Sequence, residues 1–184
     1  MRDWYLMSSS PRLLGAARTM YRLSNEMAKP DAERKSGFQE RDLPRFKASV
    51  AGIDRTYDAK VDKALVMNSL VKYAAQPAAS RNANFDAAVG IKDGMTEAHL
   101  STLWAALYSK TPLHDAKARP EWLTKKPADF KASNDPFIKA AVAMYDGSMK
   151  KEADDEELAG KIQQSYANYM KAKIAYMNSK GQAV

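Results

Sequence analysis

The chain has 184 residues, of which 45% are hydrophobic and 28% are charged, values that are typical of one globular domain and unlike those of a disordered tail. Basic residues exceed acidic residues by seven, but the two signs are interleaved, so no basic stripe of the kind that binds nucleic acid is present. The absence of cysteine excludes disulfides and thiolate metal sites. We therefore expect one domain over residues 1–184, with no cofactor, no metal and no nucleic-acid partner.

The first residues do not have the features of an export signal. The segment Arg2–Met7 and the three serines after it lack a long apolar core and a small-residue cleavage site. No stretch approaches the ~20 uninterrupted apolar residues of a spanning helix. We expect no membrane span, and we expect any export signal of a parent protein to lie upstream of residue 1.

Proline and glycine divide the first half of the chain into helices. Ser10 before Pro11 favours a helix start, and apolar residues at spacings of three and four predict a helix that ends before Pro30. A second helix is expected over about 43–54. A third begins after Asp58 and carries apolar residues on more than one face, which favours a central position. The segment 77–94 is expected to be mostly loop, with a helical turn at 85–89.

The second half follows the same pattern. Thr96 is a suitable cap for a helix that stops near Pro112, and four prolines between 112 and 136 predict short turns anchored by Trp122 and Phe130. A helix from Pro136 is expected to end at Gly147, and a longer one over about 151–179 starts with acids that suit the helix dipole. Its predicted buried side consists of Leu158, Ile162, Tyr166, Tyr169 and Ile174. With no strand pattern, the prediction is an all-α fold: an irregular multi-helix bundle of about six to eight helices with proline-rich connections.

The two histidines are the first candidates for catalysis. No serine lies in a Gly-X-Ser-X-Gly setting, and Ser8 to Ser10 are interpreted as a helix entry. His114 stands beside Asp115, but adjacent residues seldom face each other as a base and its partner, so a loop histidine is favoured. We predict no catalytic residue.

Metal and phosphate sites are also disfavoured. His99 has Glu97 two positions before it, not a second histidine four positions away, and the acidic run 154–157 lacks the alternating ligands and turn glycine of a calcium loop. We interpret that run as a helix N-terminus. The pair Gly90 and Gly94 has neither the spacing nor the lysine of a phosphate loop.

Aromatic and methionine side chains leave two interpretations open. Trp104, Tyr108, Tyr166 and Tyr169 could stack on nucleic-acid bases, but they fall in helical apolar stripes, which favours core packing. The ten methionines fit either an adaptable binding groove or an irregular helical core.

Three local blocks carry a resemblance to a known family. The segment 29–44 contains Lys-Pro-Asp-Ala-Glu-Arg and then Ser-Gly-Phe-Gln-Glu-Arg-Asp. A second block starts at Tyr57-Asp58, continues through 61–65 and reaches Arg81. The third is Asn-Asp-Pro-Phe-Ile at 134–138, followed by 140–144 and later by Tyr169-Met170. In this order the blocks resemble the later part of the inserted α-helical domain of the bacterial serine dipeptidyl aminopeptidases of the 7 and 11 type, in the chymotrypsin clan.

The resemblance covers about Trp4 to Val184 and implies a function that belongs to a larger protein. In that family two β-barrel halves carry a histidine, an aspartate and a serine, and the helical insert caps the cleft where dipeptides are released from the amino end of a peptide. No position here matches a triad motif, so we predict no catalytic residue. The resemblance implies that the asparagine that helps to hold the substrate amine lies upstream of residue 1, so the substrate-binding residues are unknown. The block Gln39, Glu40, Arg41 and Asp42 is expected to be structural.

The main hypothesis is therefore a cap domain of a periplasmic or cell-surface enzyme, inactive alone, with the β-barrel catalytic domains of its parent as partners and peptide substrates reached through the parent. A surface shaped to lie on other domains predicts self-association of the isolated chain. The alternative is a free-standing helical module that binds peptide or protein in an apolar groove. A weaker alternative is a basic nucleic-acid binder, whose affinity would depend on salt.

Overall fold

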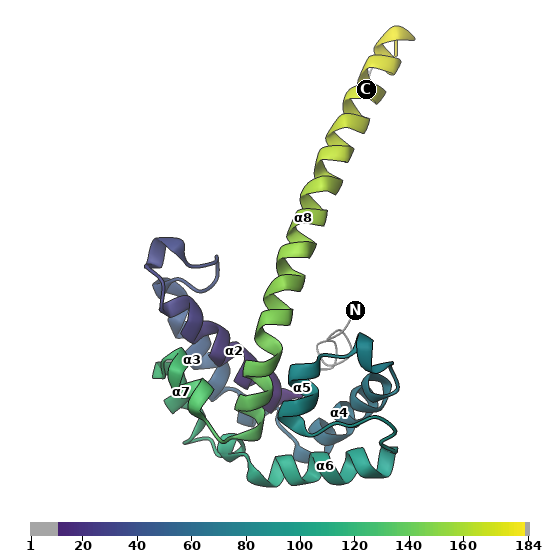
Figure 1. The fold of residues 1–184 in the computed structure, drawn as a ribbon. Helices are drawn as coiled ribbons and strands as arrows, with labels where there is room; N and C mark the ends of the chain where they lie inside the picture. Colours follow the sequence, from purple (N-terminus) through teal and green to yellow (C-terminus); the bar gives the residue numbers. More distant parts are fainter. Residues whose placement is uncertain (1–10, 183–184) are drawn as a thin grey trace. The chain divides into compact units, whose positions relative to one another are not determined.

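The computed structural model describes residues 11–182, and every regular element in that range is helical (Figure 1). This confirms the prediction of an all-α fold with no strand in the described part of the chain. The α-helices are α2 (Arg12–Met27), α3 (Leu43–Ala51), α4 (Ala59–Ala74), α5 (Ala83–Val89), α6 (Glu97–Lys110), α7 (Pro127–Ala132) and α8 (Pro136–Ser179). Short 3-10 helices join them: η1 (Asp31–Glu33), η2 (Glu40–Asp42), η3 (Ile53–Arg55), η4 (Ala78–Ser80), η5 (Pro112–His114) and η6 (Arg119–Thr124).

The chain divides into two compact units, one that ends at Tyr145 and one that begins at Asp146, so α8 contributes residues to both. In the first unit α4 packs against α6, and α2 packs against η6 and α7. The core of this unit is made by large side chains with almost no exposed surface: Leu13, Leu14, Met20, Leu70, Tyr73, Phe85, Leu100, Trp104, Phe130, Phe137 and Ile138. Whether residues 1–184 form a single domain stays a prediction.

Helix α2 shows how the sequence pattern produces this core. Leu13, Met20 and Leu23 are buried at spacings of seven and three residues, as the apolar stripe predicts, whereas Met27, the last apolar residue of that stripe, is 38% exposed. The structure starts the helix after Pro11, while the predicted cap Ser10 and the serines before it lie outside the described residues.

Polar side chains cap the starts of α4, α6 and α8. Asp58 accepts hydrogen bonds from Lys60 N at 2.8 Å and Val61 N at 2.9 Å at the start of α4, and Thr96 caps α6. The carboxylate of Asp135 accepts from Phe137 N at 2.7 Å and from Ile138 N at 3.1 Å, which fixes the start of α8. These bonds satisfy first-turn N–H groups that have no partner within a helix.

Aromatic contacts then lock the helices together. The rings of Trp104 and Phe137 stack with centroids 5.3 Å apart, and Tyr108 meets Phe137 edge-on at 4.9 Å. Phe130 is fully buried, and its ring centroid lies 4.7 Å from that of Trp122. The prediction that Trp122 and Phe130 anchor the proline-rich segment is therefore confirmed.

Helix α4 is less central than predicted. Val66, Leu70 and Tyr73 are buried, but Val61 and Leu65 are exposed on the other side. Val61 and Leu65 on the second face of α4 therefore do not pack against another element that the structure describes. Single exposed apolar residues are common on folded proteins, so their presence does not predict a second buried face.

The prediction that a helix ends at Gly147 is wrong, because α8 continues without interruption from Pro136 to Ser179. Glycine within a helix costs only about 1 kcal/mol relative to alanine, and Gly147 does not adopt the left-handed conformation that ends helices. The acidic run 154–157 therefore lies inside α8. The prediction that this run forms a helix N-terminus is also wrong. Its carboxylates pair instead along the helix with lysines four residues away, as in Lys150–Asp154, Lys151–Asp155 and Glu157–Lys161.

The predicted buried side of this helix is also wrong. Leu158, Ile162, Tyr166, Tyr169 and Ile174 are between 41% and 63% exposed. In residues 146–182, the described part of the second unit, α8 is the one helix. This part of the unit therefore offers no second surface against which the apolar side of α8 can pack. Over residues 11–182 we find no helix that is both long enough and apolar enough to cross a membrane.

Candidate functional site

The two histidines have separate structural surroundings. His99 lies in the first turn of α6, where its Nδ1 accepts a hydrogen bond from Thr96 N at 3.4 Å while Thr96 Oγ1 accepts from His99 N at 3.3 Å. His114 lies in η5, and its carbonyl accepts from Arg119 Nη1 at 3.2 Å. The side chain of Asp115 accepts from Lys117 N at 2.8 Å, so this carboxylate stabilises a turn. Sequence proximity of His114 and Asp115 does not create a base with an orienting acid.

The part of the chain that the structure describes has no group of three histidine, aspartate or glutamate side chains placed to hold a metal ion. The acidic run 154–157, the densest set of carboxylates in the sequence, lies along one exposed stretch of α8 with lysine partners. This arrangement suits a solvated helix surface.

The most extensive polar network centres on Arg81, which is buried after the 3-10 helix η4. Its Nε donates to Asp86 Oδ2 at 2.8 Å, and its Nη1 donates to the carbonyls of Gln76 at 3.0 Å and Ala74 at 3.3 Å. Its Nη2 donates to Asp93. The guanidinium thus satisfies carbonyls at the C-terminal end of α4 and joins them to α5 and to the loop before α6. Hydrogen bonds to Asp86 and then to Asp93 hold the pKa of Arg81 above its usual value.

Tyr73 extends this network into the core. Its hydroxyl donates to Asp86 Oδ1 at 2.8 Å and accepts from Asn82 N at 2.8 Å, while its ring meets Phe85 edge-on. Every nitrogen of the Arg81 guanidinium has a partner, so this cation serves packing and is not available to an incoming anion.

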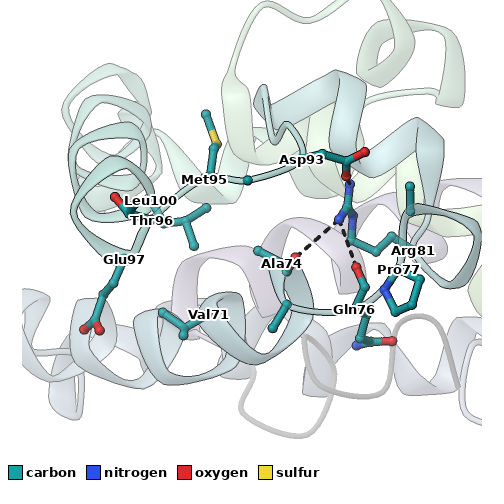
Figure 2. A pocket seen from close by; sticks show the side chains of 13 residues that line it. Val71, Ala74, Gln76, Pro77, Arg81, Asp93, Met95, Thr96, Glu97 and Leu100 are labelled. Atoms are coloured by element: carbon teal, nitrogen blue, oxygen red, sulfur yellow. Dashed lines mark hydrogen bonds and ion pairs between the residues drawn. The ribbon is translucent and has the colours of Figure 1, made fainter.

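Beside this network lies an open cleft of about 580 Å³ between α4 and the start of α6 (Figure 2). Val71, Ala74 and Leu100 form an apolar part of its lining, and Asp93 and Glu97 stand on either side of it. The Asp93 side chain is largely exposed despite its bond to Arg81. An apolar lining between two carboxylates can bind a small apolar group of a ligand that also has a positive charge nearby. The hydroxyl of Thr96, which also lines the cleft, accepts a hydrogen bond from His99 N and caps α6.

A buried carboxylate, Asp62, joins three helices and was not identified from the sequence. It is 3% exposed and accepts hydrogen bonds from Arg12 N at the start of α2 and from the hydroxyl of Tyr108 on α6. Burial and then the bond to Asp62 raise the pKa of Tyr108 above its usual value. Burial, followed by the charge of Asp62, also raises the pKa of Tyr57. An acid among the apolar positions of a helix was the available signal.

Arg119 is a second buried cation that the sequence did not single out. It donates through Nη1 to Leu113 O at 2.9 Å and through Nη2 to Asp54, so it ties η3 to η5 and η6. Its partners are fixed parts of the fold, which indicates a structural role.

The charged block at 39–42 is held mainly by carboxylates that accept from backbone groups. Asp42 Oδ2 accepts from Gln39 N at 3.1 Å, and Asp31 Oδ1 accepts from Glu40 N at 2.7 Å. Arg45 Nη2 donates to the carbonyl of Gly37, whose φ of 90° suits glycine. The predicted structural role agrees with these contacts, although the bonds are chiefly carboxylate-to-backbone and not Arg-to-carboxylate.

Known proteins are similar to this chain along almost all of its length. The family model described as peptidase S46 matches residues 1–184, the whole chain. The chain belongs to the peptidase S46 family. It is also 39% identical over 173 residues to the Asp/Glu-specific dipeptidyl-peptidase of Shewanella putrefaciens (strain CN-32 / ATCC BAA-453). That alignment covers 94% of this chain but only 23% of the relative, so this S46 chain spans about a quarter of the relative's length.

Within this S46 chain, the structure brings together residues that sequence reasoning kept apart. Arg81 meets Asp86 and Asp93, and Asp62 meets Tyr108 across 46 positions of sequence. The α4–α6 cleft is the candidate binding site, and Arg81 with its partner Asp93 forms part of its wall.

Proposed function

We propose that this chain is the α-helical cap domain of a serine-type dipeptidyl aminopeptidase, an enzyme that removes dipeptides from the amino ends of peptides, and that the chain is inactive alone. The observation that carries the proposal is the disparity in coverage: nearly the whole chain aligns with a dipeptidyl-peptidase, yet it spans 23% of that protein. The buried charges Arg81, Asp62 and Arg119 are each engaged in holding helices together. Such a segment supplies shape to an enzyme whose chemistry lies in other parts of the polypeptide.

The proposed partners are the β-barrel catalytic domains of the same polypeptide and the peptide substrates that they process, in the periplasm or at the cell surface. A cap of this kind would contribute by closing over the cleft and excluding water while the substrate is held. The chain itself needs no cofactor in this role.

An acidic substrate preference is part of the proposal. The relative is named as Asp/Glu-specific, and residues 1–145 of this chain hold 23 basic and 16 acidic side chains. A net positive domain beside a cleft attracts acidic peptides at long range, an effect that weakens as salt is added.

A free-standing helical module that binds peptide or protein is the second candidate. The exposed apolar side of α8 favours it, because such surfaces mark interaction sites. A module of this class would bind its ligand with the 184-residue chain alone, whereas a cap domain would need the rest of the peptidase.

The test compares the 184-residue chain with a longer polypeptide that includes it and the flanking regions. Both are assayed with fluorogenic dipeptidyl substrates that carry Asp, Glu, Leu or Lys before the cleaved bond. We expect hydrolysis only by the longer polypeptide, loss of that hydrolysis with a serine-directed reagent, and faster cleavage after Asp and Glu at low salt. A matched control is the longer polypeptide with residues 1–184 removed. Serine-reagent-sensitive hydrolysis by the short chain would overturn the claim that it is inactive alone.

A further inference from the structure

The α4–α6 cleft is acidic, although the packed unit around it is basic. Among the residues that the structure describes, its charged lining consists of Arg81, Asp93 and Glu97, and no lysine lines it. Arg81 donates to Asp93 and also to Asp86, so its positive charge is shared between two carboxylates. These four side chains are one base and three acids, a net charge of −2, whereas residues 1–145 carry a net charge of +7. The sign of the cleft is therefore opposite to that of its surroundings.

Both acids of the lining keep oxygens that can accept from a ligand. Asp93 accepts from Arg81 through Oδ1, and its side chain is 73% exposed. The exposed carboxylate of Glu97 has no ion pair or hydrogen bond within residues 11–182. The two carboxylates lie on either side of the cleft, so a cation placed between them is attracted by both (Figure 2).

The rest of the cleft is largely apolar. Val71 and Ala74 line it from α4, Leu100 lines it from α6, and Met95 lines it from the segment before α6. The volume of about 580 Å³ lies within the range of sites that hold small ligands. A lysine side chain combines the two properties that this lining calls for, because its methylene groups pack on apolar surface while its ammonium reaches a polar group.

We propose that the α4–α6 cleft binds the lysine side chain of an incoming peptide. The methylene groups of that lysine lie against Val71 and Leu100, and its ammonium lies between the carboxylates of Asp93 and Glu97. An ammonium is a compact charge whose donors can point to separate acceptors, whereas the planar fork of arginine suits one carboxylate with both oxygens open. Asp93 already gives one oxygen to Arg81, which favours lysine. Charge complementarity is the observation that selects this occupant.

The inference goes beyond the proposed function. The acidic preference proposed for the peptidase depends on the net charge of the whole basic unit, whereas lysine recognition depends on one cleft of opposite sign. Binding at this cleft is measured without hydrolysis. The two claims can therefore fail separately.

The probe is the peptide acetyl-Ala-Lys-Ala-amide, whose blocked ends leave the lysine ammonium as its charge. Amide NMR spectra of the unaltered 184-residue chain locate the bound peptide. We expect a dissociation constant on the order of 1 mM that rises with salt, and signal shifts centred on residues 74–77 and 93–97. No binding at ~10 mM peptide, or shifts confined to another part of the chain, would overturn the proposal.

Two further peptides test the charge and its shape. Norleucine in place of lysine keeps the aliphatic stem without the ammonium and should raise the dissociation constant on the order of tenfold. Equal binding of the norleucine peptide would overturn the claim that the carboxylates recognise a cation. The arginine peptide should bind less tightly than the lysine peptide, and binding that is as tight or tighter would overturn the assignment of lysine.

Matched variants test the position of the attraction. Glu97→Gln removes a carboxylate charge at nearly constant size and should raise the dissociation constant of the lysine peptide about threefold or more. Glu121→Gln removes an exposed carboxylate elsewhere in the same unit and should leave it unchanged. Ala78→Trp puts a large ring at an exposed lining position and should weaken binding of the lysine and norleucine peptides alike. Equal effects of the two glutamate variants would overturn the proposal, and circular dichroism checks that all three variants keep the helical content of the unaltered chain.

The longer polypeptide distinguishes an incoming peptide from an internal occupant. If the lysine peptide binds there with a similar dissociation constant and Glu97→Gln weakens it, the cleft is open to peptides in the complete protein and the proposal is confirmed. If the 184-residue chain binds the peptide and the longer polypeptide does not, another part of the same polypeptide occupies the cleft and the proposal is overturned.

Discussion

The two units of this chain use the same kind of helix pattern with opposite results. In α2 the apolar side chains Leu13, Met20 and Leu23 are almost entirely buried, whereas in the later part of α8 Ile162 and Tyr166 are mostly exposed. Both sets recur at helical spacing. The difference lies in the surroundings. Helix α2 packs against η6 and α7, whereas in the described part of the unit that begins at Asp146 the regular secondary structure is a segment of α8. Periodicity therefore identifies an apolar face, and a second surface decides whether it becomes a core.

Their charges differ as well. Residues 1–145 carry the whole net charge of +7, and residues 146–184 are neutral but divided into an acidic and a basic segment. A domain with net charge attracts oppositely charged ligands at a distance, while a divided helix favours one orientation of a neighbouring helix. The net charge of the chain thus lies in one unit, and the separation of charge by sign lies in the other.

The largest expected difference between the units comes from truncating one aromatic residue in each. Trp104→Ala removes a fully buried ring that stacks on Phe137 and should lower the free energy of unfolding by about 3–5 kcal/mol. Tyr169→Ala removes an exposed ring and should change it by less than about 0.5 kcal/mol under dilute, monomeric conditions. Urea denaturation followed by circular dichroism measures both. Equal losses would contradict the division into a packed and an unpacked helical surface.

A second comparison uses two aspartates four residues apart at the start of α4. Asp62→Ala removes a buried acceptor shared by Arg12 N and the Tyr108 hydroxyl, and we expect a loss of about 2–3 kcal/mol. Asp58→Ala removes an exposed cap and should cost about 1 kcal/mol. Denaturation midpoints measured side by side test the order. A larger effect at position 58 would contradict the role assigned to Asp62.

The pH dependence of the packed unit follows from Tyr108. Burial, and then the hydrogen bond to Asp62, raise its pKa in the folded protein above the value of about 10 found in unfolded chains. The unfolded state therefore loses this proton first, so the stabilisation is fully present below about pH 10 and declines as pH rises towards the folded pKa. Tyr108→Phe should lower stability at neutral pH by about 1–2 kcal/mol and reduce the alkaline decline. Thermal melts from pH 8 to 11 measure this loss of stability. If stability falls as steeply in Tyr108→Phe as in the unaltered protein, groups other than Tyr108 cause the alkaline decline.

The smallest expected effects come from two glycines. Gly160 lies inside the exposed part of α8 with open space around it, so Gly160→Ala should stabilise the helix by about 0.5–1 kcal/mol. Gly90 ends α5 with a φ of 87°, so Gly90→Ala should destabilise the packed unit by about 1 kcal/mol. Helical content and melting temperature should therefore both rise in Gly160→Ala and both fall in Gly90→Ala. Changes of the same sign would contradict either the left-handed conformation of Gly90 or the helical conformation of Gly160.

Much of the fold could be predicted from local chemistry, but the contacts of the candidate site could not. Asp58 and Thr96 were identified as caps because a cap needs only the next three residues. The bond between Asp62 and Tyr108 joins residues 46 positions apart, and the sequence offers many other acids that could have filled the same role. Arg81 illustrates the same limit, since its partners Asp86 and Asp93 are two among the several carboxylates near it in sequence.

The sequence by itself determined the helical class, the places where proline and capping side chains begin the helices, and the family to which the chain belongs. Those features depend on neighbours within a few residues or on local blocks of sequence. Only the tertiary structure decided that α8 continues through Gly147, that Asp62 and Arg119 are buried, and that the apolar side chains in the later part of α8 are exposed. The physical reason is that burial is a property of two surfaces in contact, whereas a sequence pattern describes one surface at a time.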